Sequence, residues 1–273
     1  MPASLAAVHP RAALRRLAGH GDLLLTLSLH RIKVRYKQSR LGIVWAVLQP
    51  LAIMLAFALV FALLGGAPSE GVPYPVFAYA ALVPWTAFAS GLSSATNALT
   101  AHASLLTKVS FPREILPLTY VVAAMTDAAL ACGALALLMI WYGIALSPHV
   151  IWAVVAILLL AVWLTGAGML LSAAQVRYRD VGLAMPVVLQ VWMFATPVVY
   201  PLSLAKAQLP AAAYWLYIAN PMAGIADTFR RATVLHQPPD PHALLMSAAV
   251  AGALVPLAFV YFKLAEFTMA DVV

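Results

Sequence analysis

The sequence predicts an all-α integral membrane protein. Of its 273 residues, 64% are hydrophobic and only 9% are charged, whereas soluble domains carry about 25% charged residues. Several uncharged runs are also long enough to cross a hydrocarbon core of about 30 Å as helices. We expect six transmembrane helices, an N-terminal amphipathic interface helix, and a re-entrant helical hairpin before the last span.

The net charge of +7 is concentrated in residues 1–40, which hold eight basic residues and one acid, while the rest of the chain holds eight of each sign. A basic segment followed by an apolar run stays on the cytoplasmic side, where it meets anionic headgroups and water. The charge therefore indicates membrane topology and contact with membrane lipids. No nucleic-acid partner is expected.

The basic segment ends in the stretch from His30 to Pro50, which reads HRIKVRYKQSRLGIVWAVLQP. Basic and apolar residues alternate over residues 31–37, and alone this pattern indicates a strand. A single strand at a membrane surface has nothing to pair with, so we favour an interfacial helix. We expect residues 1–40 to form a cytoplasmic tail with this helix and residues 41–273 to form the six-helix transmembrane domain.

Six apolar segments account for the expected spans. They cover about residues 41–64, 76–99, 115–146, 150–175, 182–200 and 242–262. An even number of spans places both termini on one side, and with the N-terminus in the cytoplasm thirteen basic residues lie inside and three outside. That distribution satisfies the positive-inside rule.

Two short charged connections lie on the predicted cytoplasmic face. The first, about residues 104–117, is either a surface turn or a lever that docks a cytoplasmic partner. Its candidate contact residues are Leu106, Lys108, Phe111, Pro112, Arg113 and Glu114. The second holds Arg177, Arg179 and Asp180, for which a partner contact and structural salt bridging are both open.

Residues 201–241 contain apolar patches that are too short to cross a membrane, separated by prolines. Asn220 followed by Pro221 predicts a helix start, with a capping side chain and a proline in the first turn. We interpret the segment as two short helices that dip into one leaflet.

Enzymatic motifs are absent from the sequence. No Gly-Lys pair occurs, so there is no phosphate-binding P-loop. Cys132 is the only cysteine, which excludes an intrachain disulfide and a cysteine-rich metal site. We therefore expect a transport subunit rather than an enzyme, with no catalytic residue, metal or cofactor of its own.

Asp127 is the only acid deep in a predicted span. Because intramembrane charge is costly, this position indicates a substrate contact or a proton relay. A carboxyl group bonded to hydroxyl groups such as that of Thr126, or to a neighbouring helix, explains it equally well.

Aromatic residues are abundant, and most fit an interfacial belt or helix packing. If the substrate is a sugar chain, flat aromatic faces along a path would let it slide without tight binding. The candidates for such a path are Tyr79, Trp85, Phe88, Trp192, Tyr214 and Trp215.

These stretches together resemble the membrane subunits of type-2 ABC exporters for polysaccharides, which serve O-antigen, capsule and teichoic-acid export. The resemblance covers nearly the whole chain in order. It depends on residues 35–50 (RYKQSRLGIVWAVLQP), 111–117 (FPREILP), 177–180 (RYRD) and 220–222 (NPM) with Phe229 and Arg230 after them.

The resemblance implies a homodimer in the bacterial inner membrane, with two copies of a separate cytoplasmic P-loop ATPase subunit that bind ATP and Mg²⁺. A channel along the dimer axis would pass a lipid-linked polysaccharide. The interface helix would act as a gate, where Arg31, Lys33, Arg35 and Tyr36 meet the pyrophosphate of the lipid carrier. Residues 104–117 would be the coupling helix. Helices within 201–241 would form an external gate that includes Asn220, Pro221 and Arg230.

Two alternatives remain open. A type-2 ABC exporter of a small hydrophobic drug or lipid would share the fold. An ion-coupled secondary transporter would need internal repeats and paired intramembrane acids, and Asp127 alone is available.

Overall fold

The computed structural model describes residues 19–37, 40–66, 68–108 and 111–272, which form helices joined by turns, with no strand among them. The helices are α2 (Gly21–Lys37), η2 (Gly42–Val44), α3 (Trp45–Leu63), α4 (Tyr74–Thr96), η3 (Thr100–His102), α5 (Ala103–Lys108), α6 (Ile115–Trp141), α7 (Val150–Arg177), α8 (Asp180–Phe194), α9 (Leu202–Gln208), α10 (Ala211–Ile218), α11 (Pro221–Arg230), the π-helical turn η4 (Arg231–Leu235) and α12 (Pro241–Val272). The expected all-α class is confirmed.

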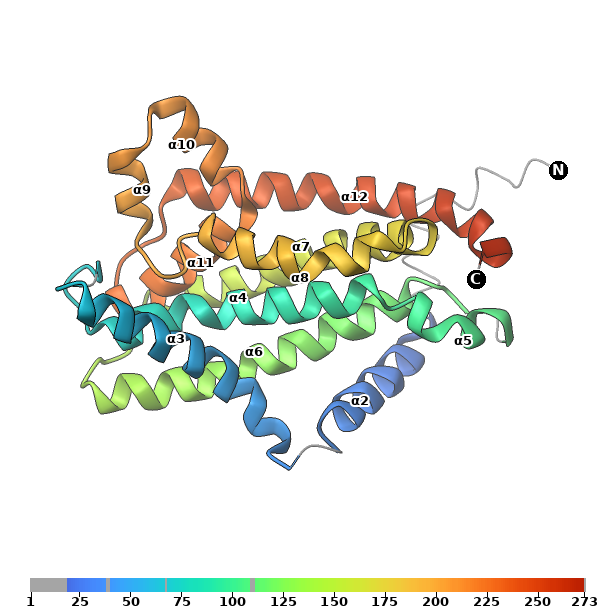
Figure 1. Cartoon of the computed structure of the whole chain (residues 1–273), viewed down its shortest axis with the longest axis horizontal. Helices are drawn as coiled ribbons and strands as arrows, with labels where there is room; N and C mark the ends of the chain where they lie inside the picture. The colour runs from blue at the N-terminus through green and yellow to red at the C-terminus, as the bar shows by residue number, and fades with distance from the viewer. Residues whose placement is uncertain (1–18, 38–39, 67, 109–110, 273) are drawn as a thin grey trace.

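Four long helices, α4, α6, α7 and α12, run side by side along the molecule (Figure 1). Helix α4 lies at the centre, and every residue from 76 to 88 is buried. It packs against α3, α6, α7 and α11, so the main apolar core surrounds it.

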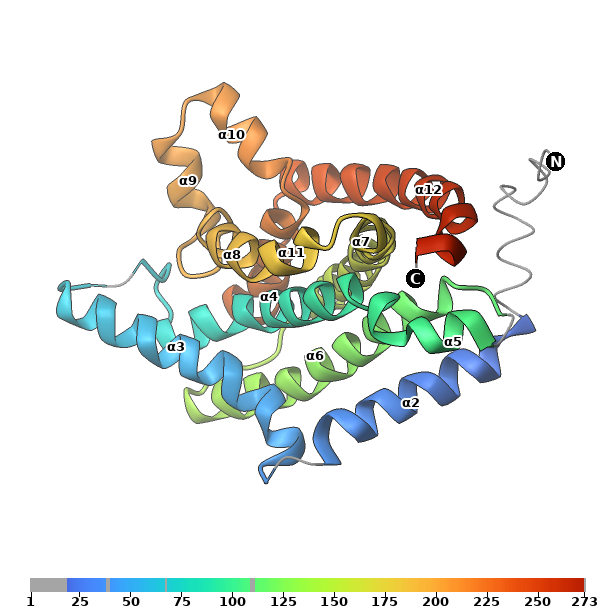
Figure 2. The ribbon, with the colours of Figure 1, turned by 45° about the vertical axis from the view of Figure 1, so that its right-hand side comes forward.

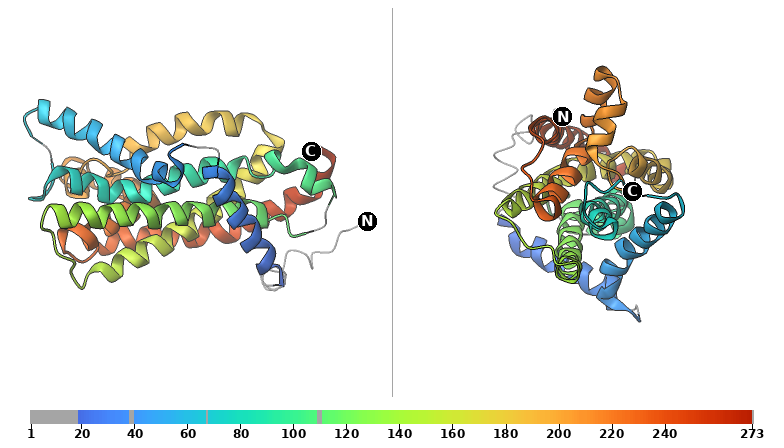
Figure 3. Two further views of the ribbon diagram at one scale, coloured as in Figure 1. Left: turned by 90° about the horizontal axis from the view of Figure 1, so that it is seen from below. Right: turned by 90° about the vertical axis from the view of Figure 1, so that its left-hand side faces the viewer.

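The bundle has two distinct ends (Figures 1 and 3). One end, which we call the α5 end, carries α5, the turn between α7 and α8, and the last turns of α12. The opposite end, the α9 end, carries the α3–α4 and α6–α7 connections together with α9 and α10. Helix α12 runs from one end to the other.

Five helices are long and apolar enough to cross a membrane, and they correspond to five of the six expected spans. They are Gly42–Leu63, Tyr74–Thr96, Ile115–Trp141, Val150–Arg177 and Pro241–Glu266. The protein is therefore a multi-pass membrane protein.

The expected count of six spans is not confirmed, because α8 is shorter than the span expected over 182–200. It has 15 residues, about 22 Å of helix against a hydrocarbon core of about 30 Å. Residues 195–200 form turns instead, and the Val198 amide bonds the Thr196 carbonyl at 2.7 Å. Pro197 follows this end and disfavours helical geometry in the residue before it, although α8 itself continues through Pro186.

The expected two short helices of residues 201–241 are in fact three, α9, α10 and α11, followed by η4. Helices α9 and α10 project from the bundle at the α9 end (Figure 2). Helix α11 lies inside the molecule, where all ten of its residues are buried and it packs against α4, α7 and α12.

Helix α2 confirms the preference for a helix over a strand at residues 31–37. It continues through Lys37, packs on α6, and runs obliquely to the bundle (Figure 1). Helix α12 continues to Val272, ten residues beyond the expected end at residue 262.

Candidate functional site

Two arginines one helical turn apart attach α2 to α6. The Arg35 Nη1 lies 2.6 Å from Oδ2 of Asp127, which connects the expected gate helix to the one acid deep in a span. The Arg31 Nε donates to Oγ1 of Thr119, and its guanidinium lies 3.8 Å from the ring centroid of Tyr120. Residues spaced by four share one helix face, so this face of α2 is the docked one.

Lys33, another expected gate residue, is exposed, as Arg35 is. The backbone of Tyr36 belongs to α2, but its side chain lies outside the described part of the structure.

A cavity of about 300 Å³ lies beside this contact, and its lining includes His30, Arg31, Arg35, His102 and Tyr120. Burial, together with the positive charge of Arg31, lowers the pKa of His102. His102 is therefore neutral near pH 7, and Arg31 and Arg35 carry the positive charge of the cavity.

The connection from α5 to α6 is fastened to the end of α12 by an ion-pair cluster that we call the clasp. Its members are Arg113, Glu114, Lys263 and Glu266. The Lys263 ammonium contacts Glu114 at 2.5 Å and Glu266 at 2.8 Å, and Nη1 of Arg113 donates to the Glu266 carbonyl at 2.9 Å. Sequence reasoning identified Arg113 and Glu114 but missed Lys263 and Glu266, although a Lys-x-x-Glu spacing at the end of a span was visible.

The expected coupling segment, about residues 104–117, is helical only in part. Helix α5 covers Ala103–Lys108 at the α5 end, whereas residues 111–114 form a turn in which Phe111 and Pro112 are half-buried. The side chains of Leu106 and Lys108 lie outside the described part of the structure.

The second connection expected on the cytoplasmic face is exposed at the same end. Arg177, Arg179 and Asp180 are all exposed, and no ion pair joins them to any other described residue. Beside them is a cavity of about 470 Å³. Gln175 shapes the turn there by accepting a hydrogen bond from the Gly182 amide at 2.5 Å.

Asn220 caps α11 as the sequence predicts. Its Oδ1 accepts from the Met222 amide and from Trp192 Nε1, both at 3.1 Å, and Pro221 occupies the first turn. Its Nδ2 donates to the Ala195 carbonyl and to Thr196 Oγ1 at 3.2 and 2.9 Å. One amide side chain thus joins the start of α11 to the end of α8.

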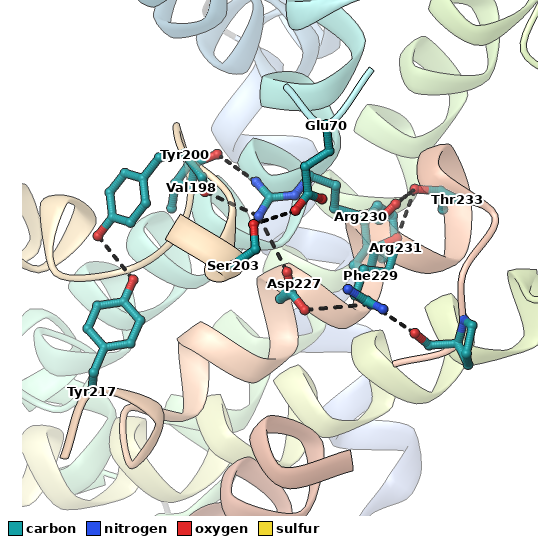
Figure 4. Close-up of polar contacts among 11 residues, drawn as sticks. Glu70, Val198, Tyr200, Ser203, Tyr217, Asp227, Phe229, Arg230, Arg231 and Thr233 are labelled. Atoms are coloured by element: carbon teal, nitrogen blue, oxygen red, sulfur yellow. Dashed lines mark hydrogen bonds and ion pairs between the residues drawn. The ribbon is translucent and has the colours of Figure 1, made fainter. Parts of the chain in front are cut away.

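Arg230, at the end of α11, is fully buried and held by backbone oxygens (Figure 4). Its guanidinium nitrogens donate to the carbonyls of Val198 and Tyr200, each at 3.2 Å. The Asp227 carboxylate lies 3.5 Å away, and the Phe77 ring lies 4.0 Å below the guanidinium. Asp227 was missed by sequence reasoning, although its spacing of three residues from Arg230 was visible.

The aromatic candidates lie in different surroundings. Tyr79, Trp85 and Phe88 are at most 3% exposed, inside the helix bundle. Trp192 is half-buried and meets Phe88 edge to face at 5.2 Å between ring centroids. Tyr214 is buried in a small cluster with Leu202, Ile218 and Ala243. Trp215 alone among the six is exposed, at 48%.

Comparison with known proteins identifies similar chains. Residues 22–233 match the ABC-2 type transporter family. The chain is 30% identical over 242 residues to the O-antigen export system permease protein RfbA of Myxococcus xanthus, covering 88% of this chain and 91% of that one. It is 27% identical over 210 residues to the protein of the same name from Klebsiella pneumoniae, covering 77% and 79%. It is also 23% identical over 219 residues to the polysialic acid transport protein KpsM of Escherichia coli, covering 76% and 80%.

Proposed function

Because the chain belongs to the ABC-2 type transporter family, we propose that it is the permease subunit of an ATP-driven exporter of a lipid-linked polysaccharide. Two copies form the channel across the bacterial inner membrane, with both termini in the cytoplasm. Two copies of a separate P-loop ATPase bind ATP and Mg²⁺, since this chain contains no P-loop. The relatives named for O-antigen export and polysialic acid transport support a glycan as the substrate.

The observation that carries the proposal is the continuous packing between the two ends of the molecule. At the α5 end, the clasp fastens the α5–α6 connection to α12. Toward the other end, Ser247 Oγ of α12 lies 2.9 Å from the carbonyl oxygen of Pro221 at the start of α11. Movement imposed on α5 by an ATPase therefore has a packed route, along α12, to the buried helix α11.

Substrate entry is assigned to α2 in this proposal. Arg31, Lys33 and Arg35 place three positive charges on a helix that is attached to the bundle mainly through α6. Arginine forms paired hydrogen bonds with phosphate oxygens, so this helix suits the phosphate-bearing head of a lipid carrier.

The test is co-purification followed by reconstitution. A tagged form of the chain should retain a P-loop ATPase of its host, and lipid-linked glycan should stimulate ATP hydrolysis by the complex in proteoliposomes. Glycan export by this chain alone would overturn the proposal. Stimulation by small hydrophobic drugs or simple lipids, without any response to glycan, would instead identify the drug or lipid exporter that shares this fold.

A further inference from the structure

The contact between α2 and α6 contains an ion pair whose two members differ in exposure. The Arg35 side chain is 38% exposed, whereas that of Asp127 is 12% exposed. Asp127 is the only acid of α6. A mostly buried carboxylate thus holds a guanidinium whose side chain is more than a third exposed.

Arg35 also lies between two cavities. A small one, about 50 Å³, has both Arg35 and Asp127 in its lining. The larger one, about 300 Å³, has Arg31 and Arg35 in its lining, and the described residues around it include no acid. Its volume is at the lower end of the range for small-ligand sites, about 300–1,000 Å³. An anion that entered the larger cavity would meet the face of Arg35 that Asp127 leaves free.

A carboxylate and a phosphate compete for the same guanidinium. Both accept the paired N–H donors of arginine in the same planar geometry. The phosphate monoester of phosphatidic acid carries nearly two negative charges near neutral pH, and a pyrophosphate between a lipid and a sugar carries one on each phosphate. Either group attracts Arg35 more strongly than one carboxylate does.

We propose that Asp127 is an internal counter-ion, which holds Arg35, and with it α2, against α6. A phosphate group that enters the larger cavity then replaces the Asp127 carboxylate as the partner of Arg35. Asp127 is then a positioning residue, because it acts through Arg35 and does not touch the ligand. The inference rests on the proposed function, in which α2 meets the head of a lipid carrier. The phosphate shifts α2 because it binds more tightly to Arg35 released from Asp127 than to Arg35 paired with Asp127.

A plain structural role for the ion pair predicts different behaviour from a counter-ion. If the pair only fastens α2, then removing either partner loosens the helix and leaves phosphate binding unaffected. If Asp127 competes with phosphate, Asp127→Asn strengthens phosphate binding and Arg35→Gln weakens it, although both variants loosen α2. The opposite signs separate the two roles.

The test uses the full chain with its ATPase subunit in lipid nanodiscs. Binding is measured with fluorescently labelled phosphatidic acid, with labelled diacylglycerol as the phosphate-free control. Docking of α2 is measured as backbone amide hydrogen exchange of residues 21–37. Asp22→Asn is the matched control variant, because Asp22 is an exposed acid in the first turn of the same helix.

We expect Asp127→Asn to bind phosphatidic acid about two- to fivefold more tightly, the factor that corresponds to a partly exposed ion pair. Arg35→Gln should bind it more weakly by at least that factor. Both variants should exchange faster in α2 without the lipid, and phosphatidic acid should accelerate exchange in the unmodified chain. Asp22→Asn should match the unmodified chain in both measurements.

Affinity changes of the same sign in both variants, or no change in either, would overturn the inference. So would equal binding of labelled diacylglycerol. Displacement of the label by inorganic pyrophosphate would show that a free phosphate group suffices, whereas binding of the lipid alone would assign the site to a headgroup, and either result supports the anion site. Neither measurement requires transport, so a failure of glycan export would count against the proposed function only.

Discussion

Glu114, just before α6, and Lys263, in the last third of α12, form an ion pair although 149 positions separate them along the chain. The side chain of Glu114 is 2% exposed and that of Lys263 is 13% exposed. The pair therefore lies largely away from solvent, where loss of one partner leaves an uncompensated charge.

Lys263→Met should destabilise the protein more than Glu114→Gln does. The methionine leaves the Glu114 carboxylate buried without its counter-ion, at a cost of about 3 kcal/mol. In Glu114→Gln the buried group is neutral and Lys263 keeps its contact with Glu266. Thermal unfolding of the two variants in detergent measures the difference, and equal midpoints would contradict the burial argument.

Gly224→Ala should separate α11 from α12. A Cβ at this position would overlap Oγ of Ser247 and the carbonyl oxygen of Ala243, and the backbone atom cannot swing away. Overpacking of this kind costs about 1–3 kcal/mol. Gly252→Ala in α12 is the matched control, because nothing lies within 4 Å of its Cβ position. Unfolding midpoints should fall for Gly224→Ala and stay or rise for the control.

Asn220→Ala should cost more than the loss of a helix cap alone, which is about 1 kcal/mol. The variant also removes the acceptor for Trp192 Nε1 and the donor to Thr196. Asn220→Ser keeps an acceptor oxygen for the Met222 amide and adds no charge, but it loses the contacts with Trp192 and Thr196. Its unfolding midpoint should therefore lie between those of the alanine variant and the unmodified chain. A serine variant as unstable as the alanine variant would contradict the contribution of the cap.

Acidification should weaken the structure around α2 through His102. The pKa of His102 in the folded state lies below the ordinary value of about 6.5. The contribution of neutral His102 to folding stability is therefore complete above pH 6.5 and is lost as the pH falls below 6.5. Protonation there adds a positive charge near Arg31. Between pH 7.5 and pH 5.5, the unfolding midpoint of the unmodified chain should fall further than that of His102→Gln. An equal fall in both would exclude His102 as the cause.

Trp85→Ala and Trp215→Ala should show which of the two rings contributes to packing and which contacts a sugar chain. Trp85 is 3% exposed and Trp215 is 48% exposed. The first change should cost about 3–5 kcal/mol and reduce the yield of folded protein. The second should leave folding intact and slow glycan export if the predicted aromatic path includes this ring. Normal export by folded Trp215→Ala would remove that residue from the path.

The sequence predicted the elements that depend on local composition. Five apolar runs became helices of spanning length, and Asn220 with Pro221 marked the start of α11. Pro201 and Pro210 likewise precede α9 and α10, so the third helix of this segment was also visible. The end of α8 was missed because apolar residues continue past it: Val198 and Val199 are buried without being helical. Hydropathy alone does not distinguish apolar residues of a spanning helix from apolar residues buried in a turn.

The contacts that organise the candidate sites were beyond prediction from sequence. Arg35 and Asp127 are 92 positions apart, and Arg113 and Glu266 are 153 apart. No local pattern relates residues at such separations, because only the tertiary packing brings them together. The sequence did single out Asp127 as an acid deep in a span, and Arg35 and Arg113 as basic residues in charged segments beside the spans. Their partners are known only from the structure.

The surroundings of Arg230 affect how this region tolerates sequence change. The oxygens that receive its guanidinium hydrogens belong to the main chain at positions 198 and 200, and every amino acid carries a carbonyl there. Only an arginine at position 230 supplies these guanidinium donors, whereas any residue at positions 198 and 200 supplies a carbonyl acceptor. Among homologous chains and in mutational scans, position 230 should therefore vary little, while positions 198 and 200 are limited by their own packing and not by the guanidinium they hold.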